Sequence, residues 1–294
     1  MLGVILEIFI YILSAVAAAL LIIGLIEPHL LVVERIKWQS GNTNSSSGFS
    51  QADKILPGQN SKNIRLVFLS DLHTEFNFLS PEQVCGQIIS ANPDAVVFAG
   101  DWTGKENTSQ MEKAEIWRAL LVETADKLQI PIVAVPGNHD REKTRKWLSD
   151  SGSGIKFLVN DTYTITAADG SIWQIHGFDD LKHGKPLISA STIVDPEQTI
   201  AVAHNPDTLL QLNSQQSRFF LSGHFHGGQI WTPGHLEFRF LRREKIAAMG
   251  FRRGSFRYNG MNCYISRGLG CVVMPIRLFS KPELTILEIS NHEV

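Results

Sequence analysis

Five short apolar segments of this chain each end in a turn that carries aspartate, asparagine or histidine. They are IRLVFLSDLH (64–73), DAVVFAGDW (94–102), IPIVAVPGNHD (130–140), TIAVAHNPD (199–207) and LSGHFHGGQI (221–230). Short runs rich in Val, Ile and Phe between turn residues predict buried strands. In α/β folds, ligands bind beyond the carboxyl ends of such strands. We therefore expect the polar side chains of these five turns to meet at one edge of a sheet.

The last of these segments carries two histidines, His224 and His226, with glycines on both sides. On an extended backbone, residues i and i+2 point to the same face, so the pair predicts half of a metal site. Taken alone, the pair could equally be two polar residues at a strand end. The four other segments with the same pattern favour the metal site.

Composition describes an ordinary folded protein with enough apolar residues for a large core. The chain has 294 residues, of which 44% are hydrophobic and 19% are charged, which allows one large domain or two small ones. The net charge of -2 argues against a general nucleic-acid binder. Cys85, Cys263 and Cys271 are widely spaced and form no CxxC motif, so they predict buried free thiols in a reducing compartment.

Residues 8–26, IFIYILSAVAAALLIIGLI, contain no charge and are long enough to cross a bilayer as a helix. A secretory signal peptide is the alternative, but basic residues before the run and a small-x-small cleavage pattern after it are both missing. We therefore expect a single-pass transmembrane anchor over residues 1–29. Arg35 and Lys37 follow the run and no cation precedes it, which predicts a cytoplasmic catalytic domain at the inner membrane.

Residues 30–294 show no further boundary and predict one domain. A strand-like segment, 30–38, follows the anchor directly, so the active face is expected near the lipid surface. Residues 39–63 are rich in Ser, Asn and Gly and predict a flexible loop insertion. Predicted strands at 64–70, 94–99 and 131–135 then alternate with predicted helices at 81–91, 109–128 and 141–149, and shorter strands follow, the last two in NCYISRG and ELTILEIS. This order predicts an α/β fold in which two sheets pack face to face between outer helices.

The polar residues of the five turns can be given roles from their chemistry. The predicted ligands of two divalent cations are Asp71, His73, Asp101, Asn138, His204, His224 and His226. Asp71, His73 and His226 would hold the first cation, and the two oxygens of Asp101 would bridge to a second one about 3.5–4 Å away. Carboxylate, amide and imidazole donors favour Mn²⁺, our first choice, or Zn²⁺, Fe or Co²⁺. Such a pair lowers the pKa of a shared water and neutralises phosphoryl oxygens during in-line attack.

The turn that carries Asn138 also supplies His139 and Asp140. We interpret His139 as a catalytic residue that donates a proton to a phosphoryl oxygen or the leaving group, with Asp140 orienting its ring. The alternative is a structural histidine that caps the turn.

The motifs DLH, GDW, GNHD, AHNPD and GHFHGGQ, in this order, resemble those of the calcineurin-like metallophosphoesterases, and the resemblance covers the chain from about residue 30 to its end. The resemblance implies a four-layer sandwich of two mixed β-sheets flanked by helices, two divalent metals, the seven ligand roles above, and His139 at the catalytic position. The chain departs from the family pattern at Trp102, Phe225 and Thr74–Glu75. These departures remove no ligand, and they leave the substrate open.

EPHLLVVERI and the terminal SRGLG, PIRLF and PELTILEI segments further resemble a membrane-anchored subgroup. That subgroup includes phosphodiesterases of the bacterial envelope and a UDP-2,3-diacylglucosamine pyrophosphatase of lipid A synthesis. The resemblance implies a lipid-linked phosphate substrate, most specifically UDP-2,3-diacylglucosamine cleaved to the lipid 1-phosphate and UMP. A general envelope phosphodiesterase acting on wall polymer or phospholipid headgroups is the first alternative, and a non-catalytic metal-binding scaffold is the second.

A basic segment interleaved with apolar residues follows the last metal motif. The cations in it that we expect to bind substrate are Arg242, Arg243, Arg252 and Arg253. A solvated loop is the ordinary interpretation of such a run. In an anchored protein, however, the apolar residues could enter the bilayer interface while the cations hold phosphate or anionic headgroups.

Overall fold

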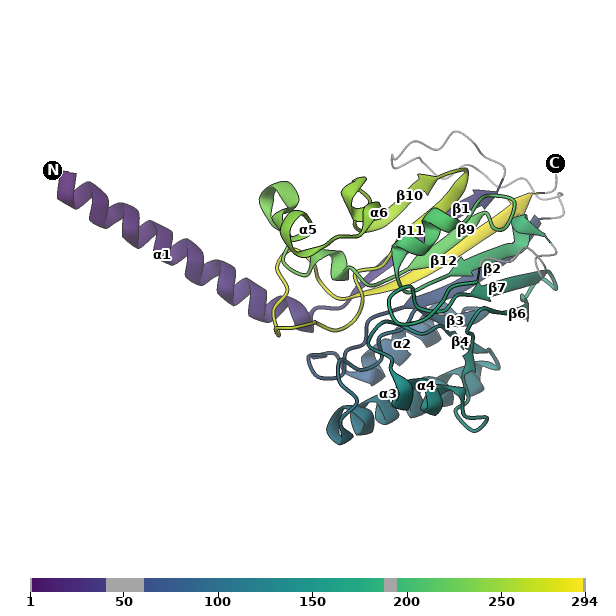
Figure 1. Cartoon of the computed structure of the whole chain (residues 1–294). Coiled ribbons are helices and arrows are strands. Elements are labelled where there is room, and N and C mark those ends of the chain that lie inside the picture. Colours follow the sequence, from purple (N-terminus) through teal and green to yellow (C-terminus); the bar gives the residue numbers. More distant parts are fainter. Residues whose placement is uncertain (1, 41–60, 188–194, 293–294) are drawn as a thin grey trace.

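The computed structural model describes residues 2–40, 61–187 and 195–292. It begins with a helix, α1 (Leu2–Ile26), that projects away from the body of the protein, and a 3₁₀ turn, η1 (Glu27–His29), leads from it into the first strand (Figure 1). Most of the loop expected at 39–63, residues 41–60, lies outside the described residues, and its two ends belong to strands.

Two six-stranded mixed sheets form the centre of the body. In spatial order, the first sheet consists of β1 (Val32–Ser40), β12 (Glu283–His292), β2 (Ser61–Leu69), β3 (Ala95–Phe98), β4 (Ile132–Ala134) and β5 (Lys156–Phe157). The second consists of β10 (Gly254–Tyr258), β11 (Met261–Ile265), β9 (Phe219–Ser222), β8 (Thr199–Val202), β7 (Ile172–Gly177) and β6 (Asp161–Thr166). The two last strands of the chain, β11 and β12, therefore lie in different sheets.

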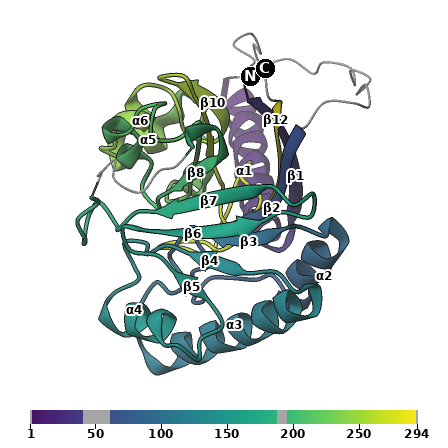
Figure 2. The same ribbon diagram turned by 90° about the vertical axis from the view of Figure 1, so that its right-hand side faces the viewer.

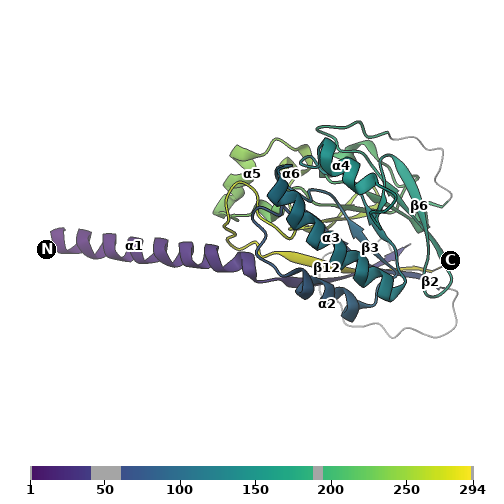
Figure 3. The same ribbon diagram turned by 90° about the horizontal axis from the view of Figure 1, so that it is seen from below.

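Helices cover the outer faces of both sheets. The first sheet carries α2 (Pro81–Ala91), α3 (Thr108–Leu128) and α4 (Glu142–Ser149), as Figure 2 and Figure 3 show. The second is covered by α5 (Leu236–Leu241), α6 (Lys245–Ala248) and η4 (Pro206–Gln211). Three more 3₁₀ turns, η3 (Pro196–Gln198), η5 (His226–Gly228) and η6 (Pro233–His235), lie in the connections of this half of the chain. Helix α2 begins where predicted because Ser80 caps it, its hydroxyl accepting the N–H of Gln83, and because Pro81 suits a first turn.

Three apolar layers separate these four layers of backbone. Between the sheets, residues such as Phe68, Ile175 and Phe219 are fully buried, and Trp38 stacks on Phe219 with 5.7 Å between ring centroids. A second cluster lies under α2, α3 and α4, and a third lies under α5, α6 and η4. The expected α/β fold with two mixed sheets and outer helices is confirmed. The three cysteines are buried free thiols.

Apart from Glu7, helix α1 is apolar, and it is exposed on all sides from Gly3 to Ile23; it is long and apolar enough to cross a membrane. Only its last turn packs on the body. The carbonyl of Gly24 accepts the N–H of Arg277 at 3.0 Å, and buried Glu27 accepts the N–H of Ser280 at 3.1 Å. The end of the helix is therefore built into the fold of the domain.

Candidate metal centre

All five predicted turns meet at the carboxyl ends of β2, β3, β4, β8 and β9. Backbone hydrogen bonds join them: the N–H of Asp71 donates to Gly100, that of His73 donates to Asp101, and that of Gly223 donates to His204. Because β2, β3 and β4 are parallel neighbours, as are β8 and β9, both sheets deliver their turns to the same place.

The backbone at the predicted ligands is unusual. Asp71, His73, Asp101, His224 and His226 all have positive φ, between 41° and 73°. Non-glycine residues rarely adopt this left-handed conformation, and when they do the surrounding structure holds them in it, often at functional sites. The extended backbone assumed for the two histidines of GHFHGG is therefore wrong, because β9 already ends at Ser222. His224 and His226 do not share a face; they turn into two different clusters.

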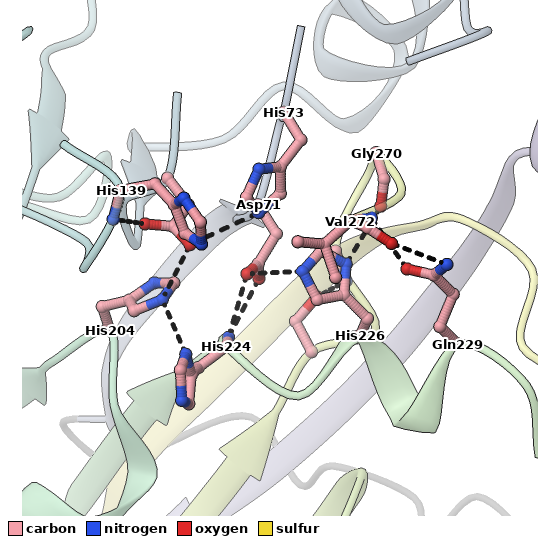
Figure 4. Close-up of polar contacts among 12 residues, drawn as sticks. Asp71, His73, His139, His204, His224, His226, Gln229, Gly270 and Val272 are labelled. Carbon is pink, nitrogen blue, oxygen red and sulfur yellow. Dashed lines mark hydrogen bonds and ion pairs between the residues drawn. The ribbon is translucent and has the colours of Figure 1, made fainter. Parts of the chain in front are cut away.

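The side chains form two buried clusters of potential metal ligands. The first contains Asp71, His73 and His226, and the second contains Asp101, His204 and His224; within each cluster the ligand atoms lie within 4.8 Å of one another. Figure 4 shows the imidazoles of His204, His224 and His226 arranged around the side chain of Asp71. Oδ2 of Asp101 lies 3.3 Å from Nε2 of His73 and 3.2 Å from Nε2 of His204, so this carboxylate stands between the clusters.

The free nitrogens of these histidines are directed inward by contacts on their other nitrogens. Nδ1 of His204 lies 2.7 Å from the carbonyl of Ala99, and Nδ1 of His226 lies 3.0 Å from that of Gly270. In both rings Nε2 is left for the cluster. Both ring nitrogens of His73 are buried without a hydrogen bond to any described residue. Buried polar atoms need partners, so this site fits bound cations better than it fits a closed protein interior.

Sequence reasoning missed Glu244. Its Oε1 lies 2.9 Å from Nε2 of His224, whose Nδ1 faces His204 at 3.1 Å. A carboxylate behind a ligating imidazole fixes the ring and makes it a better donor. Glu244 is 20 residues from His224 in a segment that looked like a basic loop, and no sequence spacing connects the two.

Charge at the site accounts for several perturbed pKa values. Burial alone would lower the pKa of His204, but the adjacent Asp101 carboxylate raises it to about 10. Burial would raise the pKa of Asp101, but the nearby charges of His204 and His73 hold it well below its usual range. Burial likewise opposes ionisation of Glu244, and the hydrogen bond and charge of His224 lower its pKa to about 2. The site is thus a compact network of interacting charges.

Asn138 and His139 both border this network. Oδ1 of Asn138 lies 3.1 Å from Nε2 of His204, in the second cluster. The backbone N–H of His139 donates to Oδ1 of Asp101 at 2.7 Å, and its ring lies 5.0 Å from that of His73. Nδ1 of His139 lies 3.1 Å from the carbonyl of Gly104. When Nδ1–H donates a hydrogen bond to that carbonyl, Nε2 remains available to a substrate.

The role predicted for Asp140 is wrong. Its carboxylate does not contact the His139 ring, because the turn directs it inward, where it accepts the backbone N–H groups of Asp101 (2.7 Å), Trp102 (2.8 Å) and Gly137 (2.9 Å). Asp140 therefore ties the two turns that present Asp101 and Asn138. Burial and the charge of Asp101 raise its pKa to about 6.

A cavity of about 950 Å³ opens over both clusters. Its lining includes His139, Lys182, Arg242 and Arg243, together with the Val272–Met274 loop. The guanidinium of Arg242 donates to the carbonyl of His224 at 2.9 Å, which holds this cation beside the second cluster.

The other two predicted substrate-binding arginines do not line this cavity. Arg252 lies over the ring of Phe238, and Arg253 lies over that of Trp231 and donates to the carbonyl of Phe279. Both guanidinium groups thus pack on aromatic rings that are not part of the cavity lining.

The departures from the family motifs are packing residues. Trp102 is fully buried and stacks on Phe98, and Phe225 is buried in the layer under α5. Glu75 accepts the N–H of Gly104, and the hydroxyl of Thr74 donates to the carbonyl of Gln110. These residues support the ligand turns from behind.

Comparisons with known proteins agree with this geometry. A family model described as calcineurin-like phosphoesterase matches residues 64–246. The uncharacterized metallophosphoesterase YkuE of Bacillus subtilis is 29% identical over 77% of this chain and 79% of its own length. Phosphodiesterase YaeI of Escherichia coli is 26% identical over 83% of this chain and 94% of its own length. A transmembrane protein with metallophosphoesterase domain from Danio rerio is 26% identical over 76% of this chain and 52% of its own length. The chain belongs to the calcineurin-like phosphoesterase family and is a metal-dependent phosphoesterase.

Proposed function

We propose that this protein is a membrane-anchored phosphodiesterase that uses two divalent cations, Mn²⁺ first among them, to cleave a phosphodiester or pyrophosphate bond of a lipid-linked substrate. The observation that carries the proposal is the position of the cavity. Ligand residues from both clusters line it, it has cations at its wall, and it is bordered by the same loop that holds the end of α1.

The ligand assignment follows the two clusters. Asp71, His73 and His226 would hold one cation, and His204, His224 and Asn138 would hold the other. Asp101 would serve both, since one of its oxygens already lies within 3.3 Å of a histidine from each cluster. When bound, such a pair of cations activates water and neutralises charge on a phosphoryl group.

The chain's own residues would position the substrate and move the proton. Arg242, Arg243 and Lys182 line the cavity and can hold phosphoryl oxygens. With Nδ1–H donated to the carbonyl of Gly104, a doubly protonated His139 ring can give its Nε2 proton to the leaving oxygen and become the neutral Nδ1–H form. Buried Asp140 keeps the turns beneath these groups in register.

The anchor supports a lipid substrate. Glu27 is buried and hydrogen-bonded to Ser280, so cleavage near the end of α1 would remove a residue from the packed domain, which favours an uncleaved span over a signal peptide. Arg35 and Lys37 follow the span, which favours a catalytic domain in the cytoplasm. UDP-2,3-diacylglucosamine is the most specific substrate we propose, with the lipid 1-phosphate and UMP as products.

A general envelope phosphodiesterase acting on wall polymer or phospholipid headgroups is the second candidate. The resemblance to YaeI, which is named a phosphodiesterase, favours it. A non-catalytic scaffold has no support here, because all seven predicted ligands come together without a missing donor.

Hydrolysis by the purified full-length protein with Mn²⁺ tests these candidates. The panel contains UDP-2,3-diacylglucosamine, a lysophospholipid and soluble bis-p-nitrophenyl phosphate, and Asp101→Ala is the inactive control. We expect turnover of the nucleotide-lipid and the soluble diester. If the protein hydrolyses the lysophospholipid but not UDP-2,3-diacylglucosamine, the general envelope phosphodiesterase replaces the first candidate. If it hydrolyses none of the three compounds, the proposal is overturned.

A further inference from the structure

Large exposed apolar side chains gather at one end of the body. They are Leu236 and Phe240 on α5, and Val273, Met274 and Phe279 on the loop after Cys271; Val273 is 81% exposed and Phe240 is 75% exposed. Figure 1 shows α5 and this loop, drawn in yellow, on the side of the body from which α1 projects. Single exposed apolar residues are common on proteins, but a group at one site marks an interaction surface. We call these five residues the collar.

The loop part of the collar is held in a strained conformation by one buried side chain. Gln229 accepts the N–H of Val272 and donates to the carbonyls of Val272 and Met274, as Figure 4 shows for Val272. Val273, at the tip, has a φ of 67°, which is a rare conformation for a β-branched residue. The three hydrogen bonds of Gln229 thus hold the loop in a conformation in which the apolar Val273 side chain is exposed.

The same loop sets the level of the collar relative to α1. The apolar span runs from Gly3 to His29, and the N–H of Arg277 donates to the carbonyl of Gly24 within its last turns. A Cβ on Gly24 would lie only 2.7 Å from Ile276, so loop and helix are in tight contact. Val273 is four residues before Arg277 on this loop and Phe279 is two residues after it, so both lie near the end of the span.

The collar also borders the cavity. Val273 and Met274 line its mouth, and Glu237 and Arg242, next to the ends of α5, line its wall. Arg253, stacked on Trp231 with 3.7 Å to the ring centroid, adds a cation behind the apolar residues. An apolar tip with cations behind it is the pattern of segments that lie in a membrane interface with anionic lipids.

We propose that the collar inserts into the surface of the bilayer that α1 spans, so that the mouth of the cavity opens within the headgroup layer and takes its substrate directly from the membrane. This inference rests on the membrane anchor of the proposed function. In this arrangement the collar side of the body faces the lipid, and the phosphate of the substrate reaches the metal clusters without leaving the membrane interface.

Depth-dependent fluorescence quenching tests the insertion. Full-length protein carrying Val273→Cys is labelled with bimane and placed in nanodiscs of phosphatidylethanolamine and phosphatidylglycerol with lipids that carry a doxyl quencher near the headgroup. The native cysteines are buried and should not react. Ile172→Cys is the matched control, because Ile172 is also apolar and exposed but lies on β7 of the second sheet, away from the collar. We expect strong quenching at Val273 and little at Ile172; equal quenching at both positions would overturn the proposal.

A second variant tests the effect on turnover. Phe279 has a φ of 55°, a conformation that asparagine tolerates, so Phe279→Asn should fold. We expect kcat/KM for a lipid phosphodiester in vesicles to fall by about tenfold or more, with unchanged hydrolysis of bis-p-nitrophenyl phosphate and with Ile172→Asn as the control. Equal rates on vesicles for Phe279→Asn and wild type would refute the collar. If the wild type hydrolyses no phosphodiester, the proposed function fails, while the quenching result still decides the insertion.

Discussion

Glu244→Gln is the most informative single substitution at the metal centre. The two side chains have nearly the same shape, and the glutamine oxygen can still accept from Nε2 of His224 across the present 2.9 Å. Only the negative charge is lost. Mutation of such an outer partner of a metal-bound histidine typically costs about 10–100-fold in metal affinity, because the carboxylate charge makes the imidazole a stronger ligand. That range corresponds to roughly 1.4–2.7 kcal/mol, and we expect the same loss here because the contact is short and largely buried.

Metal titration measures this effect directly. Metal-free wild type and Glu244→Gln are titrated with Mn²⁺, and affinity is read both by calorimetry and by recovery of diester hydrolysis. Glu237→Gln is the matched control, since Glu237 lines the same cavity and is buried but accepts from Thr232 instead of a predicted ligand. The reasoning is refuted if Glu244→Gln binds Mn²⁺ as wild type does, or if Glu237→Gln weakens binding equally.

Three further predictions concern the same centre. His139→Ala should retain its metal, measured by elemental analysis, and hydrolyse the diester roughly 10²–10⁴-fold more slowly, whereas lost metal would make it a ligand. Gly137→Ala would place a Cβ 2.2 Å from Oδ1 of Asp101, so we expect a loss of about 1–3 kcal/mol in urea unfolding. Gly86→Ala is the control that should lose no stability, because its Cβ meets nothing within 4 Å and alanine in the interior of α2 is favoured over glycine by about 1 kcal/mol. In the metal-free protein, protonated His204 contributes stability that is present below pH 6.5 and lost as pH rises through about 10. Since a ligand must be unprotonated, Mn²⁺ binding at pH 8 should release a proton. Calorimetry in buffers of different ionisation enthalpy measures this release, and a binding enthalpy that is the same in every buffer would contradict the prediction.

Much of the fold could be predicted because its signals are local. The apolar runs before Asp71, Asp101 and Asn138 are strands at nearly the expected bounds, and Pro81 begins α2 as expected. The meeting of the five turns also followed from strand direction alone. The order in which the strands pair could not be predicted, since no local sequence signal indicates that the final strand, β12, belongs to the first sheet.

The details of the site depended on contacts between distant residues. The left-handed backbone at His224 and His226 arises from the packed turns around them, so the assumption of an extended strand assigned them to one face. The contact between Glu244 and His224 likewise exists only after the chain has folded. Asp140 illustrates the same limit, because a residue beside a catalytic candidate in sequence can point to the opposite side of a turn.

The position of β12 has a consequence for biosynthesis. β12 lies between β1 and β2, parallel to the first and antiparallel to the second. β1, which follows α1, can therefore join its sheet only after residues 283–292 have left the ribosome. Until then β1 has no partner among the described strands, and a nascent chain halted before residue 283 would contain α1 and β1 but lack the strand that joins β1 to the rest of the sheet.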